Sequence, residues 1–182
     1  TDLKVTAAYP FILNTPFGIE SKFMLYKRDT TFQDVQGLLG VQYILPRGNY
    51  FKVFADQKQS RLLSTMGMEN ISSLPAQIDV NNTTYGLGLR SEKLDYKFNP
   101  TRGYQFFIEG GAGTRQIIKN SNLPEQIYND IELNTAQLNG LGHFSYFIPI
   151  KKQATIKFGA KGAYRYNEQL FKNELYRIGG LL

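Results

Sequence analysis

Residues 35–56 read VQGLLGVQYILPRGNYFKVFAD, which is two alternating segments joined by a turn. In the first segment, apolar side chains occupy every second position from 39 to 45. In the second, Phe51, Val53 and Ala55 alternate with Lys52 and Asp56. A period of two places successive side chains on opposite faces of a β-strand. The intervening residues 46–48 are Pro-Arg-Gly, in which Pro presets φ and Gly permits a positive φ. The stretch therefore predicts an antiparallel hairpin with one apolar and one polar face.

The same alternation continues along most of the chain and predicts about eight strands with no helix. The parity changes between Leu89 and Leu94, which predicts a bulge near residues 91–93. The apolar positions outside the opening stretch are Leu3, Val5, Ala7, Tyr9 and Phe11; Ile19, Phe23 and Leu25; Tyr85, Leu87 and Leu89; Leu94, Tyr96 and Phe98; Tyr104, Phe106 and Ile108; Ala136, Leu138, Phe144, Tyr146 and Ile148; and Ile156, Phe158, Ala160, Tyr164 and Tyr166.

Charged residues near the strand centres fall almost wholly on the parity opposite the aliphatic residues. A Lys or Arg that faces lipid at mid-bilayer costs about 2–4 kcal/mol, so this segregation is typical of strands that span a membrane. Such a strand needs only about 9–11 residues, and the lack of a run of about 18 apolar residues is therefore no objection. Three aromatic residues, Phe54, Phe107 and Phe147, fall on the polar parity, and we expect them inside the lumen or at its rim.

Connections between the predicted strands alternate in length. Short turns are expected at 14–18, 46–48, 99–103 and 149–152, and longer loops at 62–79, 119–132 and after 167. Only the short link at 29–31 departs from this order. Short turns on one side and long loops on the other are typical of outer-membrane barrels.

Composition narrows the possible classes of protein. The 182 residues include twelve Tyr, thirteen Phe and seventeen Gly but no Cys, which argues against a disulfide-linked domain, a thiolate metal site and a Cys nucleophile. The net charge is +6, yet the basic residues are spread singly, so a nucleic-acid partner is not expected. No signal peptide is visible at Thr1, and we expect a mature or cut sequence.

A soluble β-sandwich or a lipocalin-like barrel would also show alternating strands. Two observations favour the membrane interpretation. Lys, Arg, Glu and Gln at mid-strand would fill a dry core poorly. Tyr and Phe at the ends of the apolar face suit an interfacial aromatic girdle. The predicted fold is therefore an all-β, antiparallel transmembrane β-barrel, with residues 1–182 forming one barrel segment and no second domain.

No pattern of residues predicts catalysis. His143 is the only histidine, and we expect it to face the lumen and to be hydrogen-bonded near Asn139 and Ser145. Residues 110–113, Gly-Gly-Ala-Gly, lack the ending of a phosphate-binding loop and more readily serve to relieve crowding in a strand. Carboxylates are scattered. The sequence predicts no enzyme, no cofactor and no metal site.

Two short motifs carry a family resemblance. Phe98-Asn99-Pro100-Thr101-Arg102-Gly103 resembles the N-P-T-x-G turn of the bacterial surface antigen barrel superfamily, which includes BamA, TamA and the two-partner secretion transporters. Residues 174–182 contain Arg177, Ile178, Gly179 and Gly180, and this segment is similar to the one that enters the family's lumen-folding loop. The resemblance covers residues 95–182 best; over 1–94 it rests on the strand pattern. The Tyr, Asn and Lys content resembles a Bacteroidetes member.

The resemblance implies a sixteen-stranded parent barrel, in which this chain would supply roughly the fourth to the eleventh strands. The chain departs from the family in lacking the Arg-Gly-Phe/Tyr loop tip and the periplasmic POTRA domains, which suggests a mid-barrel fragment. Asn99, Pro100, Thr101 and Gly103 would form a periplasmic turn, although ordinary turn chemistry explains the same residues.

The implied function is a BamA/TamA-like factor that inserts or translocates proteins at the bacterial outer membrane. Its partners would be outer-membrane lipid, client outer-membrane or secreted proteins, and accessory envelope proteins. Client strands are thought to add to an opened sheet edge. The alternatives are a dedicated secretion transporter, a passive pore or adhesin-like barrel, and the barrel anchor of an enzyme such as a patatin-like lipase.

Overall fold

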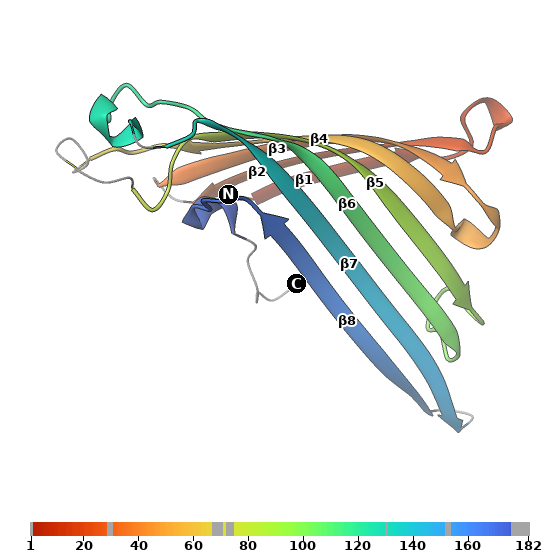
Figure 1. The fold of residues 1–182 in the computed structure, drawn as a ribbon. Helices are drawn as coiled ribbons and strands as arrows, with labels where there is room; N and C mark the ends of the chain where they lie inside the picture. The colour runs from red at the N-terminus through yellow and green to blue at the C-terminus, as the bar shows by residue number, and fades with distance from the viewer. Residues whose placement is uncertain are drawn as a thin grey trace.

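The computed structural model describes residues 2–28, 31–66, 71, 75–129, 131–151 and 154–175. They form a single antiparallel sheet in which eight strands follow one another in chain order (Figure 1). The strands are β1 (Asp2–Tyr9), β2 (Phe17–Arg28), β3 (Phe32–Ile44), β4 (Tyr50–Leu62), β5 (Val80–Leu94), β6 (Gly103–Ile117), β7 (Asn134–Lys151) and β8 (Ala154–Tyr166). The predicted all-β fold and the predicted number of strands are confirmed.

Helical structure in the described residues is limited to four 3-10 turns in the connections. These are η1 (Ile12–Asn14), η2 (Pro46–Gly48), η3 (Glu125–Tyr128) and η4 (Lys172–Glu174). None of the helices described has the length and hydropathy required to cross a membrane.

The predicted bulge at residues 91–93 is wrong. Strand β5 pairs with β6 without a register shift from Val80 opposite Ile117 to Leu94 opposite Gly103. Tyr96 and Phe98 lie beyond the end of β5, in an exposed turn, and this position explains the change of parity. A register shift does occur between Pro149 and Lys151, at the end of β7. The turn predicted at 149–152 is wrong for residues 149–151, which belong to β7, and Lys152 lies outside the described residues.

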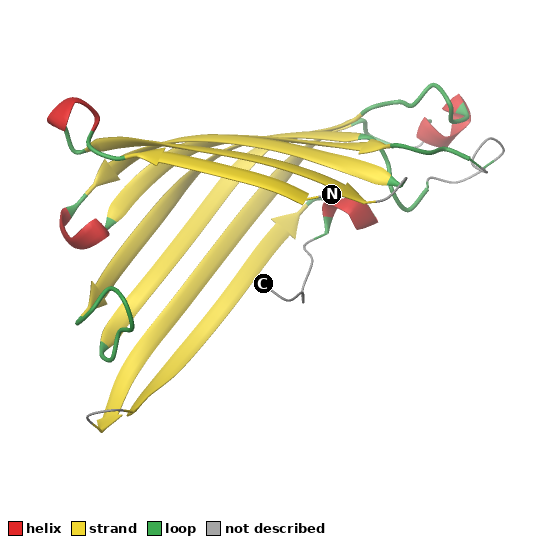
Figure 2. Ribbon diagram, turned by 180° about the vertical axis from the view of Figure 1, so that it is seen from behind, coloured by secondary structure: helices red, strands yellow, loops and turns green. Residues whose placement is uncertain are grey.

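The strands run between two ends of the sheet that differ in their connections. Segments 10–16, 45–49 and 95–102 join strands at one end, where β7 also ends and β8 begins; 63–79 and 118–133 join strands at the other. Figure 1 shows the short connections on the right and the long ones on the left, and Figure 2 shows the same arrangement from behind. The predicted alternation of connection length is confirmed.

The two faces of the sheet have opposite chemistry. The outer face carries the apolar parity, including Val35, Val53 and Leu87, and the inner face carries the polar parity. One row of the outer face crosses all eight strands without a charge: Tyr9, Ile19, Val41, Val53, Leu87, Gly110, Gly140 and Tyr164. In the regularly paired parts of the described strands, the charged residues of this parity are Lys27, Arg61 and Lys93, each the penultimate residue of its strand.

A compact apolar cluster closes the end of the sheet that carries the long connections. It joins Val80 of β5 and Ile117 of β6 to buried residues of the connections and of the segment after β8: Ile78, Leu123, Ile127, Tyr128 and Phe171. The Asp79 carboxylate accepts hydrogen bonds from the Leu62 amide at 2.6 Å and from the Asn120 side chain at 2.8 Å. The long connections are therefore packed against the sheet and against each other.

Candidate functional site

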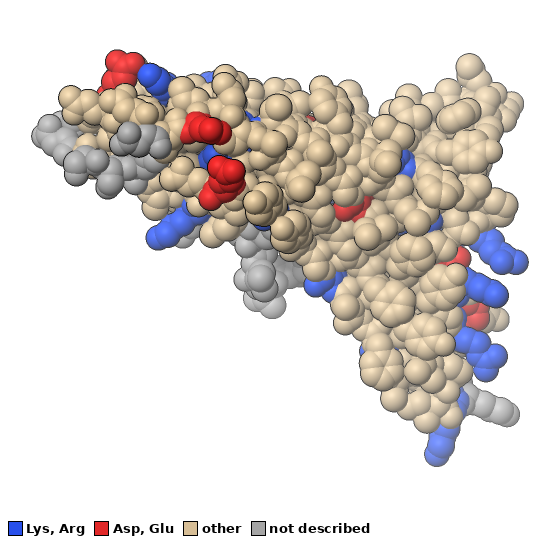
Figure 3. Space-filling view, in the orientation of Figure 1, with Lys and Arg blue, Asp and Glu red and all other residues tan. Residues whose placement is uncertain are grey.

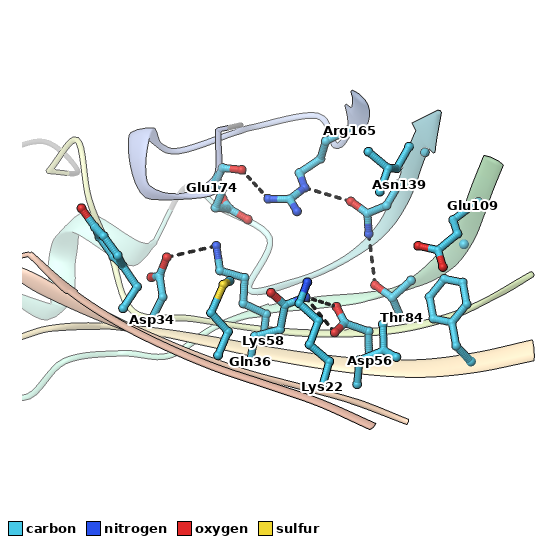
Figure 4. Close-up of a pocket in the computed structure, with 18 of the residues that line it drawn as sticks. Lys22, Asp34, Gln36, Asp56, Lys58, Thr84, Glu109, Asn139, Arg165 and Glu174 are labelled. Carbon is cyan, nitrogen blue, oxygen red and sulfur yellow. Dashed lines mark hydrogen bonds and ion pairs between the residues drawn. The ribbon is translucent and has the colours of Figure 1, made fainter. Parts of the chain in front are cut away.

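The inner face surrounds a cavity of about 420 Å³. Every strand contributes to its lining, which requires the sheet to curve around its inner face. Figure 4 shows charged and amide side chains directed into this space. Polar or charged lining residues of the eight strands, in chain order, are Asp2, Lys22, Asp34, Asp56, Thr84, Glu109, Asn139 and Arg165.

The segment that follows β8, residues 167–175, folds back onto the inner face. Its anchor is Glu174, which is 2% exposed and pairs with Arg115 of β6, itself 1% exposed. Arg115 Nε lies 3.0 and 3.1 Å from the two carboxylate oxygens, and Nη2 lies 2.9 Å from Oε2. Such a bidentate, charge-assisted pair fixes geometry as well as charge. The Phe171 ring lies 5.0 Å from the Arg115 guanidinium carbon and covers the pair.

Further hydrogen bonds tie this segment to the strands on either side. Asn167 donates to Thr135 Oγ1 at 2.8 Å and to the Ala136 carbonyl at 2.9 Å. Arg165 of β8 donates to the Glu174 carbonyl and, through Nε at 2.8 Å, to Asn139 of β7. The relay from Arg165 to Asn139 continues to Thr84 of β5 at 3.1 Å (Figure 4). The segment is held by polar contacts that reach from β5 to β8.

A second buried cation, Lys52 of β4, stands nearer the short connections. It is 3% exposed, lies 3.1 Å from Glu20 and also pairs with Glu109. Its Nζ lies 5.3 Å from the Phe54 ring centroid and 5.6 Å from that of Phe107. Cation–π attraction of this kind is favourable when the cation is desolvated. Phe54, Phe107 and Phe147 all lie on the inner parity, as predicted.

Space for Phe54 is provided by a glycine on the neighbouring strand. A Cβ built on Gly86 of β5 would lie 2.4 Å from Phe54 Cζ, so a side chain there would displace the ring. Elsewhere on the inner face, Asp34 pairs with Lys58 at 3.2 Å and accepts a hydrogen bond from Ser60 at 2.6 Å. Lys52 thus pairs across two strands in each direction, with Glu20 of β2 and Glu109 of β6, whereas Asp34 and Lys58 pair between the adjacent strands β3 and β4.

The turn predicted at 99–103 forms between β5 and β6. Asn99 has φ 60° and Gly103 has φ 117°, and a Cβ on Gly103 would meet the Lys93 carbonyl oxygen at 1.9 Å. The turn is organised by Asp95, whose carboxylate accepts from the Thr101 amide at 2.9 Å, the Arg102 amide at 3.0 Å and the Thr101 hydroxyl. The Thr101 hydroxyl, followed by the Arg102 amide, lowers the pKa of Asp95.

The remaining predicted positions have different outcomes. His143 faces the inner side, with Nε2 3.2 Å from Ser145 Oγ, as predicted. Residues 110–113 lie inside β6 rather than at a loop–helix junction. The motif residues Arg177, Ile178, Gly179 and Gly180 lie outside the described residues. The described part of the chain contains no group of three or more His, Cys, Asp or Glu side chains that could hold a metal ion.

Sequence reasoning missed the residues that organise both features of the site. Arg115 falls on the polar parity of its strand, but its partner Glu174 is 59 residues away, and no local pattern links them. Asp95 precedes the turn motif by four residues, and its role could have been inferred because Asp commonly accepts from backbone amides in turns. No family model, no curated protein and no solved structure matches the chain.

Proposed function

We propose that this chain is part of a β-barrel in the bacterial outer membrane, with its outer face toward lipid. The observation that carries the proposal is the exposure of mid-strand aliphatic residues on that face. Leu39, Val53 and Leu87 are 64%, 62% and 67% exposed. They belong to uncharged rows that run from strand to strand. A soluble monomer rarely leaves so continuous an apolar surface in water.

The inner face supports the same proposal. A soluble sandwich buries aliphatic side chains and exposes charged ones, whereas this sheet buries Arg115, Lys52 and Asp34 and exposes its aliphatic parity. In a barrel, the polar parity would line the lumen. The resemblance to the surface antigen superfamily adds a sixteen-stranded parent, in which β1 and β8 would pair with further strands.

We further propose that the parent barrel inserts or translocates proteins in the manner of BamA and TamA. Two features are compatible with this function. The turn motif at 99–103 adopts a defined, side-chain-anchored conformation. The segment 167–175 runs onto the inner face directly before Arg177, which is the course that a lumen-folding loop would take. Client strands would pair with a sheet edge, so no covalent bond would be made or broken.

Depletion of the full-length parent protein, followed by quantitative proteomics of the outer membrane, tests this function. Loss of many unrelated barrel proteins is the expected result. Loss of one secreted passenger alone would identify a dedicated secretion transporter instead. An unchanged outer-membrane proteome, together with reduced uptake of small solutes, would indicate a passive pore and overturn the assembly proposal.

A further inference from the structure

Charge is distributed unequally between the two ends of the sheet. The described short connections, 10–16, 45–49 and 95–102, contain three basic residues and one acidic residue. The described residues of the other connections, 63–79 and 118–133, together with segment 167–175, contain two basic and five acidic residues. Figure 3 shows Lys and Arg gathered at the lower right, over the short-connection end. Among the described connections, basic residues therefore outnumber acidic ones only at the short-connection end.

Large apolar side chains project from the same basic end. Leu13 in the β1–β2 connection is 88% exposed, and Phe98 in the β5–β6 connection is 89% exposed. Basic residues lie beside these tips and on the neighbouring hairpin: Arg47, Lys97 and Arg102. None of the ion pairs among the described residues involves these three cations. We call Leu13, Arg47, Lys97, Phe98 and Arg102 the basic rim.

Aromatic residues of the outer face continue from the rim toward the sheet centre. Tyr104, Tyr146 and Phe158 form one outer-face row, next to Lys93. Tyr and Phe at this level are typical of the membrane interface, where the ring lies among acyl chains and a polar group can reach the headgroups. We infer that this row marks the level of the membrane interface. The basic rim lies beyond the row, at the depth of the lipid headgroups.

We propose that the basic rim binds the headgroups of anionic phospholipids at one surface of the membrane. This inference rests on the proposed membrane function and names its lipid partner. Juxtamembrane cations are attracted to anionic headgroups, and exposed apolar tips gain free energy by entering the interface. Asp95 is the only acidic residue of the described connections 10–16, 45–49 and 95–102, and its carboxylate accepts hydrogen bonds within its own turn. Glu92 of β5 lies next to Arg47 and Lys97, but it is paired with Arg90.

An acidic protein partner is the competing interpretation, and the arrangement of the rim favours lipid. The cations lie on two hairpins and the apolar tips on the first and third, all at one end of the sheet (Figure 1). A membrane surface contacts such a ring of separate tips simultaneously.

The chain contains no Trp, so a single introduced Trp reports on one position. Three variants of the full-length parent protein, in which any Trp outside this chain is replaced by Phe, are reconstituted into vesicles of equal parts phosphatidylglycerol and phosphatidylcholine. Phe98→Trp reports on the rim, Leu87→Trp on the outer face, and Met66→Trp, at a position 90% exposed in a long connection, on the opposite end. Each variant is measured in two samples, one in which only phosphatidylglycerol is brominated and one in which only phosphatidylcholine is brominated. The quenching of Trp fluorescence is then compared between the two samples.

We expect brominated phosphatidylglycerol to quench the fluorescence of Phe98→Trp more strongly than brominated phosphatidylcholine does. The expected enrichment of phosphatidylglycerol at the rim is about fivefold per contacting cation. Adding Arg47→Gln, Lys97→Gln and Arg102→Gln, or high salt, should bring the two quenchers to equality, because both remove the electrostatic attraction. Met66→Trp should show no preference.

Two results would count against the proposal in distinguishable ways. If Leu87→Trp is quenched by lipid but Phe98→Trp is quenched equally by both lipids, or only by aqueous iodide, the rim does not select anionic lipid. Iodide quenching alone would leave an acidic protein as its partner. If lipid quenches none of the three variants, the proposed membrane function itself fails.

Discussion

Replacing Glu174 with Gln is expected to release segment 167–175 from the inner face while the sheet stays folded. The substitution keeps the size of the side chain but removes the charge opposite Arg115, whose side chain is 1% exposed. Breaking a buried pair by removing one partner costs about 3–5 kcal/mol, because the other charge is left without compensation. The loss is relieved when the segment detaches and Arg115 becomes hydrated.

That cost corresponds to a shift of about two to four orders of magnitude in the docking equilibrium, since 1.4 kcal/mol is a factor of ten. Hydrogen exchange of the amides that the docked segment protects, such as Lys172, which donates to the Ala76 carbonyl at 2.9 Å, measures this shift directly. Amides at the far end of the β5–β6 ladder, from Leu89 opposite Ile108 to Leu94 opposite Gly103, serve as the internal reference, because their exchange should not change.

Glu168→Gln is the matched control, since Glu168 lies in the same segment but is exposed. It should leave exchange unchanged. The double variant Arg115→Met with Glu174→Met should restore docking, because a buried pair can often be replaced by apolar residues of similar volume. Exchange in Glu174→Gln equal to that of the unmodified chain would refute the idea that this pair holds the segment.

Three further predictions concern the outer face and the turn. Leu87→Lys places a charge in the central apolar row and should lower the yield of membrane-inserted protein, because a charge at mid-bilayer costs about 2–4 kcal/mol. Lys157→Leu on the inner face should be tolerated. Equal membrane yields of the two variants would contradict the assignment of the faces. Gly103→Ala should destabilise the β5–β6 hairpin, because φ 117° disfavours a residue with a Cβ and the added atom would meet the Lys93 carbonyl. Thermal unfolding measures the loss of stability. An unchanged unfolding transition would show that the turn can rearrange. The pKa of the Asp95 carboxyl should lie below the ordinary Asp value, so its contribution to the stability of the turn is complete at neutral pH and is lost only as the pH falls through the lowered pKa. Carboxyl NMR measures this pKa, and Thr101→Val should move it back toward the ordinary value. An ordinary pKa in the unmodified chain would exclude the anchoring role.

The strands could be predicted from the sequence because their signal is local. Residues 51–56 alternate on their own, and the side to which Lys52 and Val53 point follows from parity alone. The positions of Phe54, Phe107 and Phe147 on the inner face followed in the same way.

What could not be predicted depends on contacts between distant residues or on the conformation of turns. The Arg115–Glu174 pair requires the course of the chain after β8, which alternation does not encode. The bulge was predicted wrongly because Leu94, Tyr96 and Phe98 alternate in the sequence as if they lay in one strand. Strand β5 ends at Leu94, however, and the turn anchored by Asp95 begins there. Pro149 was interpreted as part of a turn, yet it lies in β7 next to a register shift, where a strand tolerates a residue without an amide proton.

The central claim is that the outer face meets lipid in a closed, spanning barrel. Membrane fractionation of the native, full-length parent protein, combined with gel mobility before and after boiling, tests it most directly. Recovery in the outer membrane with a mobility shift on boiling is the result that we predict. A soluble protein without a shift would contradict the claim, and the exposed apolar parity of β3, β4 and β5 would then have to be covered by another protein surface.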